Sequence, residues 1–256
     1  MVSIIVLVYN ANQYTRHTLK TLRKTKGVKY EVIVLDNNSK YSTFKMLGKL
    51  KQRGYIDKII SLNENSYFVK GNNIASQICS KDSEYILLLN SDVEIRNSLW
   101  LNRMVAFLKE NKGAIATEIS STHDNRPDGW CYLVSKDIYL NHPLDEDRFK
   151  HLYSIAKFNG DILKNGYKVF TIKNYEDFIY HFGGKSGKTK NLKGMDTSEE
   201  ELRKWFGYMK CEVVDHLELS KGEKYTYNLH LIWIRHNFYR QLSKVKQIAK
   251  RIGLMR

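Results

Sequence analysis

The triplet Asn90-Ser91-Asp92 is a place in this 256-residue chain where residue types and spacing could do chemistry. It follows directly on the apolar run 85–89, which is typical of a short strand buried on both faces of a parallel sheet. An amide and a carboxylate two residues apart at a strand end could bind Mg²⁺ or Mn²⁺, because a hard cation that bridges phosphate oxygens needs few protein ligands. The same triplet occurs in turns, where it only bonds the backbone, so both interpretations stay open.

The run 85–89 is one of several predicted strands that alternate with predicted helices. The strands are expected at 2–8, 31–35, 59–62, 85–89 and 114–117, and the helices at 14–24, 43–52, 69–80 and 99–110. This alternation predicts an α/β fold with a doubly wound, mostly parallel sheet flanked by helices.

Polar residues follow each of the first four predicted strands. They are Tyr9-Asn10, Asp36-Asn37-Asn38-Ser39, Asn63-Glu64-Asn65 and Asn90-Ser91-Asp92. Because parallel strands end at one edge of a sheet, this edge is the expected site for a polar ligand. Each polar residue taken alone could instead be a helix cap. The chain has no Gly-x-Gly-x-x-Gly after its first strand and no complete P-loop motif. The sequence therefore supports neither a dinucleotide-binding fold nor a P-loop phosphate site.

Blocks of the chain resemble the GT-A glycosyltransferases, particularly the rhamnosyltransferase-like branch of the large family that builds bacterial surface polysaccharides. In family order, the blocks are 3–10, 34–39, 65–73 and 89–92, followed by acceptor-side blocks at 128–134, 144–146, 165–169 and 181–186. The resemblance implies a GT-A (Rossmann-like) domain over residues 1–190, with a nucleotide-sugar half at 1–118 and an acceptor half at 119–190.

The resemblance also implies donor-binding and metal-binding residues. The donor-binding residues would be Val8, Tyr9, Asn10, Asp36, Asn65, Asn72, Asn90 and Ser91. Asp36 would pair with the nucleobase. Asp92 matches the last acid of the family's Asp-x-Asp motif and would bind Mn²⁺ or Mg²⁺ together with His181, whose imidazole suits Mn²⁺ better. As a strand-end acid, Asp92 is expected to lie outside the core.

The catalytic base is the point where the chain departs from the family pattern. The family has an acidic pair about a dozen residues before Gly166-Tyr167, but here the matching stretch is Tyr153-Ser154-Ile155-Ala156-Lys157. Inverting transfer needs a carboxylate to take the proton of the acceptor hydroxyl. The nearest candidates are Asp145, Glu146 and Asp147, with Asp161 a distant fourth. We favour Asp145 or Glu146, with Asp145 slightly ahead. The alternative is that these acids cap a helix beginning near residue 148.

Basic residues are concentrated at the end of the chain. Residues 220–256 contain nine basic and one acidic side chains, a net +8 of the total +15. We expect residues 191–256 to form a basic amphipathic helical tail, with helices near 199–219 and 225–253. This tail could pack on the sheet, form a homodimer, or rest on an anionic membrane surface through 225–256.

The first functional hypothesis is a metal-dependent, inverting glycosyltransferase that moves a sugar from a UDP- or dTDP-sugar to a glycan or lipid-linked acceptor in polysaccharide biosynthesis. Because the family's acidic pair is missing, a second hypothesis is an inactive relative that only binds nucleotide sugar. The net charge motivates a third, a nucleic-acid-binding protein, although no reading module is recognisable and no nucleic acid is expected. No apolar run approaches the ~20 residues that span a bilayer. We expect a cytoplasmic protein, peripheral at the inner face of the membrane if the tail binds lipid.

Overall fold

The computed structural model describes the chain in segments. They are residues 1–117, 119–120, 126–127, 129–151, 153–172, 175–183, 200, 204, 212–214 and 231–251. The chain divides into two compact units, Met1–Lys224 and Tyr225–Arg256. The first unit contains the sheet and the candidate site, and the second contains one described helix, α8 (Leu231–Arg251).

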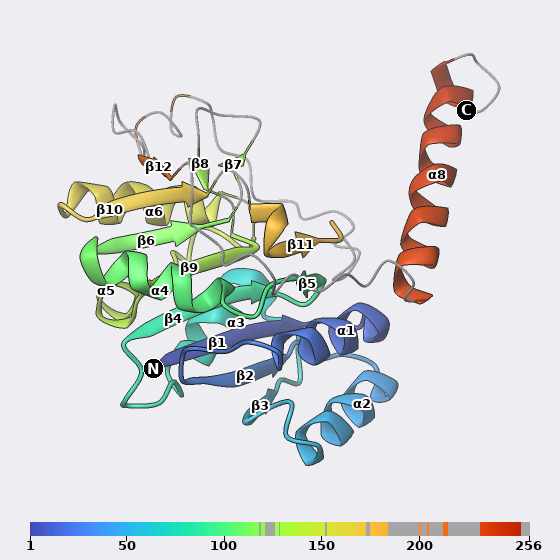
Figure 1. Ribbon diagram of the computed structural model, residues 1–256, viewed down its shortest axis with the longest axis horizontal. Helices are drawn as coiled ribbons and strands as arrows, with labels where there is room; N and C mark the ends of the chain where they lie inside the picture. Colours follow the sequence, from blue (N-terminus) through green and yellow to red (C-terminus); the bar gives the residue numbers. More distant parts are fainter. Residues whose placement is uncertain are drawn as a thin grey trace. The chain divides into compact units, whose positions relative to one another are not determined.

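Within the described residues, an eight-stranded sheet forms the centre of the first unit (Figure 1). Its spatial order is β12 (Glu212–Val214), β10 (Lys168–Ile172), β6 (Gly113–Ala116), β9 (Cys131–Ser135), β4 (Tyr85–Asn90), β1 (Val2–Val8), β2 (Tyr30–Asp36) and β3 (Lys58–Ser61). Strand β9 runs antiparallel to both β4 and β6, and the remaining pairs are parallel. The predicted mostly parallel sheet is confirmed.

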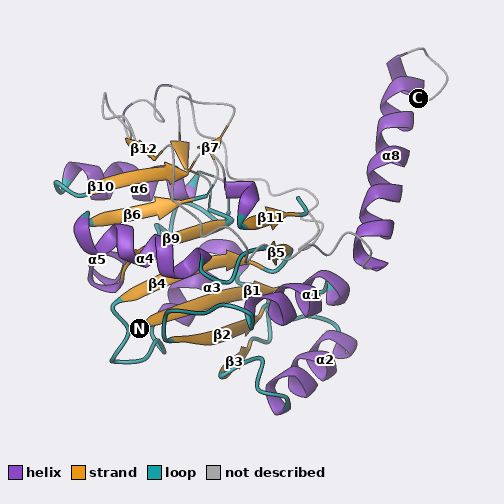
Figure 2. Ribbon diagram, viewed as in Figure 1, coloured by secondary structure: helices purple, strands orange, loops and turns teal. Residues whose placement is uncertain are grey.

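Helices cover both faces of the sheet (Figure 2). One face packs against α1 (Asn12–Leu22), α2 (Tyr41–Gln52) and α4 (Trp100–Glu110), and the other against α3 (Tyr67–Ser76), α5 (Lys136–Asn141) and α6 (Ser154–Lys164). Successive strand residues such as Ile4 and Ile5 belong to the two different cores. Because both faces are buried, the central strands β1 and β4 consist almost entirely of apolar residues, as the sequence suggests.

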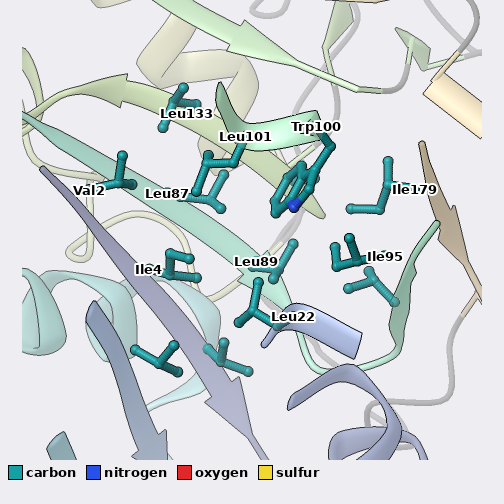
Figure 3. Packing of buried hydrophobic residues seen from close by; sticks show 14 of the residues in the cluster. Val2, Ile4, Leu22, Leu87, Leu89, Ile95, Trp100, Leu101, Leu133 and Ile179 are labelled. Atoms are coloured by element: carbon teal, nitrogen blue, oxygen red, sulfur yellow. The ribbon is translucent and has the colours of Figure 1, made fainter. Parts of the chain in front are cut away.

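The core on the α1 side is drawn in Figure 3. Ile4 and Leu87, on the neighbouring strands β1 and β4, pack there together with Leu22 of α1 and Trp100 of α4. The register aligns Val8 with Asp36 and Leu7 with Asn90. Strands β1, β2 and β4 therefore end at the same edge, and the polar residues that follow them are brought together.

Two short strand pairs stand beside the main sheet. β5 (Val93–Ile95) pairs antiparallel with β11 (Ile179–His181), and β7 (Ile119–Ser120) pairs with β8 (Arg126–Pro127). A single 3₁₀ turn, η1 (Tyr175–Asp177), leads into β11. The β5–β11 pair places His181, at the end of β11, beside Asp92, which directly precedes β5.

Three expectations need correction or remain untested. The helix expected near 199–219 is wrong at 212–214, because these residues form β12 and extend the sheet beside β10. The helix expected from about residue 148 begins at Ser154. The boundary between residues 190 and 191 and the one at residue 118 lie outside the described residues. The predicted division into a nucleotide-sugar half, an acceptor half and a tail therefore stays a prediction.

In the described part of the chain, no helix has the length and apolar character needed to cross a membrane.

The buried carboxylate of Glu31 links three segments at the edge of the sheet opposite the candidate site. It accepts hydrogen bonds from Ser3 Oγ and the Ser80 backbone N–H, both at 2.6 Å, and pairs with Lys58 Nζ at 2.8 Å. Burial alone raises the pKa of this carboxyl group, but the bonds from Lys58, Ser3 and Ser80 outweigh burial, so the pKa lies below its usual value of 4.5. A lowered pKa means that the ionised form stabilises the folded state.

We therefore expect Glu31→Gln to lower the free energy of unfolding at neutral pH by about 1–3 kcal/mol, because bonds to a buried charge are lost. The difference in free energy of unfolding between wild type and Glu31→Gln should be fully present above pH 4.5. It should disappear as the pH falls through the lowered pKa that Glu31 has in the folded state. Urea denaturation at neutral and acidic pH measures this difference. An advantage that is independent of pH would contradict it.

Candidate active site

The loops that follow β1 and β2 are tied together by hydrogen bonds. The Asn10 backbone N–H donates to Ser39 Oγ at 2.8 Å, and the Lys40 N–H donates to Asn10 Oδ1 at 3.0 Å. Asn10 has a left-handed backbone with φ 60°, a conformation that asparagine tolerates better than most residues. This conformation turns the chain sharply after Val8 and Tyr9, so the predicted nucleoside-contacting segment lies directly beside the end of β2.

Asp36 lies at the end of β2 and is only 3% exposed. Its Oδ1 accepts the Ser39 N–H at 3.1 Å, a bond within the turn that precedes α2. The N-cap residue of α2 is Lys40 and no side chain caps this helix, so Asp36 is not a helix cap. Within the described residues, no hydrogen bond to its second oxygen is present. A single carboxylate can therefore hold the turn and still offer an acceptor at the edge of the sheet.

The two predicted asparagines of the next block are engaged locally. Asn65 Oδ1 accepts the Tyr67 N–H at 2.8 Å at the start of α3, and Asn72 Nδ2 donates to the Phe68 carbonyl at 2.9 Å inside that helix. The Asn72 side chain is 1% exposed. The structure therefore gives Asn65 and Asn72 a role in shaping the start of α3. Asn37, which is not among the predicted donor-binding residues, links β2 to the same helix.

The Asn37 link consists of three bonds. Its Oδ1 accepts the Ser66 N–H at 2.9 Å and the Ser66 hydroxyl at 2.6 Å, and its Nδ2 donates to the Tyr67 carbonyl at 3.0 Å. The amide is 4% exposed. Asn37 thus fixes the amino-terminal end of α3 against the end of β2, and both border the edge where a donor would bind.

The predicted metal-binding residues lie together at the end of β4. His181 Nε2 is 3.2 Å from Asp92 Oδ1, although the two residues are 89 positions apart in the chain. Pairing of β5 with β11 brings them together, and the Phe182 N–H donates to the Asp92 carbonyl at 2.9 Å. Asn90 Nδ2 lies 3.4 Å from the same His181 nitrogen. Asp92 is fully buried, which corrects the expectation that it lies outside the core.

This arrangement fits a divalent cation held by few protein ligands. Two ligands at right angles, each about 2.1 Å from an ion, stand about 3 Å apart, close to the 3.2 Å between His181 Nε2 and Asp92 Oδ1. Asn90 could offer its oxygen instead of its nitrogen, because the two ends of an amide are assigned and not observed. The described residues contain no group of three or more His, Cys, Asp or Glu side chains able to hold a metal. The remaining ligands would have to be phosphate and water oxygens.

Neighbouring residues fix this pair in place. The Trp130 indole stacks on the His181 ring with a centroid distance of 4.8 Å and an interplanar angle of 9°. Thr18 Oγ1 lies 2.9 Å from the Ser91 carbonyl oxygen and 2.8 Å from that of Val93, either of which can accept its proton, and it accepts the Val93 N–H at 3.0 Å. Helix α1 therefore holds the loop between β4 and β5. Among the residues that the structure describes, the buried Ser91 hydroxyl has no hydrogen-bond partner. Ser91 therefore remains a donor-binding prediction.

A group of polar side chains on α1 and β5 lies beside the same loop. Glu94, 1% exposed, lies 2.7 Å from His17 Nε2 and accepts a bond from Arg96 Nε at 3.2 Å. His17 and Phe182 make an edge-to-face ring contact at 5.8 Å. Sequence reasoning missed Thr18, His17 and Glu94, because their role depends on contacts between α1 and β5 that no local pattern signals.

Trp130 provides a test of how the imidazole is held. We expect Trp130→Leu to weaken Mn²⁺ binding about 10- to 100-fold, because residues that orient a metal ligand contribute in this range. The binding can be followed by the electron paramagnetic resonance signal of free Mn²⁺. Trp130→Phe keeps a ring against His181 and should retain most of the affinity. Equal losses in the two variants would argue against stacking as the cause.

Asp145 and Glu146, the two predicted catalytic acids, lie elsewhere on the α3 side of the sheet. Asp145 Oδ1 accepts the Arg148 N–H at 3.1 Å, and Glu146 Oε2 accepts Asn73 Nδ2 at 3.1 Å. Asn73 is six residues, or about 9 Å, along α3 from Tyr67 at its start. The acids therefore close a turn and contact α3, and the structure does not bring them next to Asp92. Asp145 does not cap α6.

The stretch that replaces the family's acidic pair does approach the candidate site. Tyr153 has a left-handed backbone with φ 61°, and α6 begins at the following residue. A Cβ added to Gly129 would stand 2.6 Å from Ile155 Cγ1, so Ile155 packs directly against the residue preceding Trp130. Lys157 pairs with Asp161 at 2.5 Å. An apolar side chain thus occupies the place where the family pattern expects acids.

Comparison with known proteins gives a consistent result. The sequence profile described as glycosyl transferase family 2 matches residues 3–163. An uncharacterised glycosyltransferase of Haemophilus influenzae is 28% identical over 111 residues, which cover 43% of this chain and 33% of that protein. The chain thus matches about a third of the length of this curated relative.

Solved structures share the fold. The mannosyltransferase PcManGT of Pyrobaculum calidifontis, in complex with GDP-Man and Mn²⁺, superposes with a TM-score of 0.59 at 14% identity, covering 68% of this chain and 55% of that one. A fragment of TarS from S. aureus in complex with UDP superposes with a TM-score of 0.51 at 20% identity, covering 62% of this chain and 55% of that one. The sheet and its flanking helices are thus a GT-A fold. Because the profile matches more than half of this chain's residues, the chain belongs to glycosyl transferase family 2.

Proposed function

We propose that the chain is a metal-dependent glycosyltransferase that moves a sugar, with inversion, from a UDP- or dTDP-sugar to a glycan or lipid-linked acceptor in polysaccharide biosynthesis. The observation that carries the proposal is the Asp92–His181 pair, 3.2 Å apart at the edge where β1, β2 and β4 end. The PcManGT and TarS complexes, which contain GDP-Man with Mn²⁺ and UDP, support a nucleotide-sugar donor and a divalent cation. Membership of the rhamnosyltransferase-like branch is part of this proposal.

Each part of the edge has a proposed task. Asp36 accepts hydrogen bonds from the nucleobase through the oxygen that does not bond Ser39. The loop at Tyr9 and Asn10 lies along the nucleoside. Asp92 and His181 hold Mn²⁺ or Mg²⁺, and the ion, when bound, neutralises the charge that develops on the departing diphosphate. Since Asp92 is buried and His181 is 20% exposed, the diphosphate approaches from the His181 side.

The test of this function is a panel of UDP-, dTDP- and GDP-sugars with and without Mn²⁺. Donor binding to the folded state raises the melting temperature by an amount that grows with the logarithm of the ratio of ligand concentration to Kd. We expect stabilisation by at least one donor, with the effect removed by EDTA. Glycosyl transfer to lipid-linked and soluble glycan acceptors is then measured with that donor. No stabilisation by any donor would contradict the proposal.

The general base is proposed to be Asp145 or Glu146, with Asp145 ahead. Replacing each by its amide keeps the side-chain shape and removes its basicity, so the true base should lose at least ~10²-fold in turnover while donor affinity is preserved. Asp57→Asn, which removes a carboxylate that likewise accepts a backbone N–H, from Val32 at 2.7 Å, is the matched control. If Asp145→Asn and Glu146→Gln both turn over normally, the base lies elsewhere.

A second candidate function is a nucleotide-sugar-binding protein without transferase activity. The packing of Ile155 against Gly129 favours it, because this is where the family pattern expects the acids. Donor-dependent stabilisation without turnover on any acceptor would support this alternative. We propose no role in nucleic-acid binding.

The place of action is proposed to be the cytoplasm, with peripheral contact at the inner face of the membrane. Helix α8 exposes apolar side chains, namely Ile234, Phe238, Leu242 and Val245. These residues recur at helical spacing, as the sequence predicts, and basic residues such as Arg240 and Lys244 are also exposed. Contact with an anionic membrane and homodimer formation are the two proposed uses of this helix.

A further inference from the structure

The outer surface of α1 and α2 carries charge of one sign. Between residues 11 and 53 the chain has eleven basic and two acidic residues. All the basic side chains are exposed: Arg16, Lys20, Arg23, Lys24, Lys26, Lys29, Lys40, Lys45, Lys49, Lys51 and Arg53. The two acids, Glu31 and Asp36, are buried in β2. No exposed acid in this segment therefore offsets the positive charge.

The two helices form one continuous face. They contact each other and pack on the same side of the sheet through Leu19 and Leu22 of α1 and Met46 and Leu50 of α2. Figure 1 shows α1 and α2 side by side, both drawn in blue. We call the exposed side of these helices, with Lys40 before α2, the α1–α2 face.

Two aromatic rings project from the first turn of α2 on this face. Tyr41 is 75% exposed and Phe44 is 50% exposed, the highest values among the large hydrophobic side chains described in the first unit. Lys40 and Lys45 flank them in the chain. Exposed aromatic rings beside lysines are typical of surfaces that enter the headgroup region of a bilayer, where the rings sit at the interface and the amines reach anionic phosphates.

We propose that the α1–α2 face docks on an anionic lipid bilayer. Charge complementarity selects this occupant, because a second copy would set its own eleven basic residues against these eleven. A nucleic acid would satisfy the charge, but no nucleic-acid-reading module is recognisable in the sequence. The bilayer interface also accounts for the exposed rings of Tyr41 and Phe44.

Docking here would orient the candidate active site. Tyr41 follows Asp36 by five residues, and the Lys40 N–H bonds the Asn10 side chain at the edge where the donor is proposed to bind. The face therefore holds that edge near the lipid surface. The benefit of this orientation for transfer to a lipid-linked acceptor rests on the proposed function. Docking of the α1–α2 face on the bilayer does not depend on that function.

The test is flotation of the full chain with vesicles of phosphatidylcholine, with and without phosphatidylglycerol. We expect binding only to the anionic vesicles. The triple variant Lys40→Gln/Lys45→Gln/Lys49→Gln should bind on the order of 100-fold more weakly, since each lysine near an anionic surface contributes roughly fivefold. The matched control Lys109→Gln/Lys112→Gln/Lys164→Gln removes three exposed lysines from other elements and should lose far less. Helix α8 is unchanged in both variants, so its contribution cancels.

A second measurement locates the aromatic turn. Phe44→Trp should be quenched by brominated lipid in anionic vesicles beyond the quenching of the wild-type tryptophans, and Tyr41→Ser/Phe44→Ser should bind the vesicles more weakly. Both changes are at exposed positions, so the melting temperature should stay near that of wild type. Equal losses in the two lysine variants, no added quenching at position 44, or retention on single-stranded RNA but not on vesicles would each overturn the proposal.

Discussion

Asp92→Asn is expected to abolish metal-dependent donor binding and to lower turnover by at least about 10²–10³-fold, the range for removing one charge-stabilising group from an active site. The carboxylate is fully buried and lies 3.2 Å from His181 Nε2. Asparagine keeps the volume of this buried side chain, whereas alanine would also leave a cavity beneath the loop. The amide is therefore the cleaner change, and the fold should be retained.

Three measurements define the outcome for Asp92. Calorimetry gives the affinity for Mn²⁺, thermal shift gives donor binding with and without EDTA, and far-ultraviolet circular dichroism checks the fold. Asp137→Asn, which removes an exposed carboxylate from α5, is the matched control and should behave as wild type. Nucleotide affinity that EDTA leaves unchanged in the wild type would count against the metal site.

Replacing Asp36 should weaken donor binding by about 10- to 100-fold, the range for a lost hydrogen bond to a charged group. Asp36→Asn can still accept the Ser39 N–H, so the turn after β2 is kept and the melting temperature should change little. Asp36→Ala loses both interactions, so it should lower donor affinity and stability together. Comparing the two variants separates the contribution of Asp36 to nucleobase binding from its contribution to the turn. Asp36→Asn keeps the bond from the Ser39 N–H, whereas both variants lose the carboxylate that is proposed to bind the nucleobase.

The outcome for Asp36 is read from donor titrations followed by intrinsic fluorescence and from melting curves without ligand. Asp57→Asn is a useful control, since Asp57 also accepts a backbone N–H, from Val32 at 2.7 Å, but at the other end of β2. If Asp36→Ala lowers only the melting temperature and donor affinity is unchanged, the carboxylate serves the turn alone.

Several features of the fold could be predicted from the sequence because they follow from short-range patterns. Strands β1 and β4 are continuous apolar runs, since a central parallel strand is covered on both faces. Helices α1 and α4 have apolar residues at helical spacing, and their structural bounds differ from the predicted ones by only one or two residues. The polar strand ends could be recognised in the same way.

The resemblance to a family added assignments that periodicity cannot supply. Asp36, Asp92 and His181 were named from matching blocks, and the structure brings Asp92 and His181 within 3.2 Å. The base could not be assigned as firmly, because the usual acids are absent. The prediction of Asp145 depends on its match to the acid of the family's Phe-Asp-Glu run, whereas in the structure its carboxylate accepts the Arg148 N–H in its own turn.

Thus the amino-acid sequence by itself determined the alternation of elements and the polar edge, both of which depend on neighbours in the chain. Only the tertiary structure decided that β9 enters antiparallel between β4 and β6 and that β5 pairs with β11. It also decided that Trp130 stacks on His181 and that Glu94 is buried against His17. These contacts join residues dozens of positions apart, and their stability comes from burial and pairing that no local pattern records.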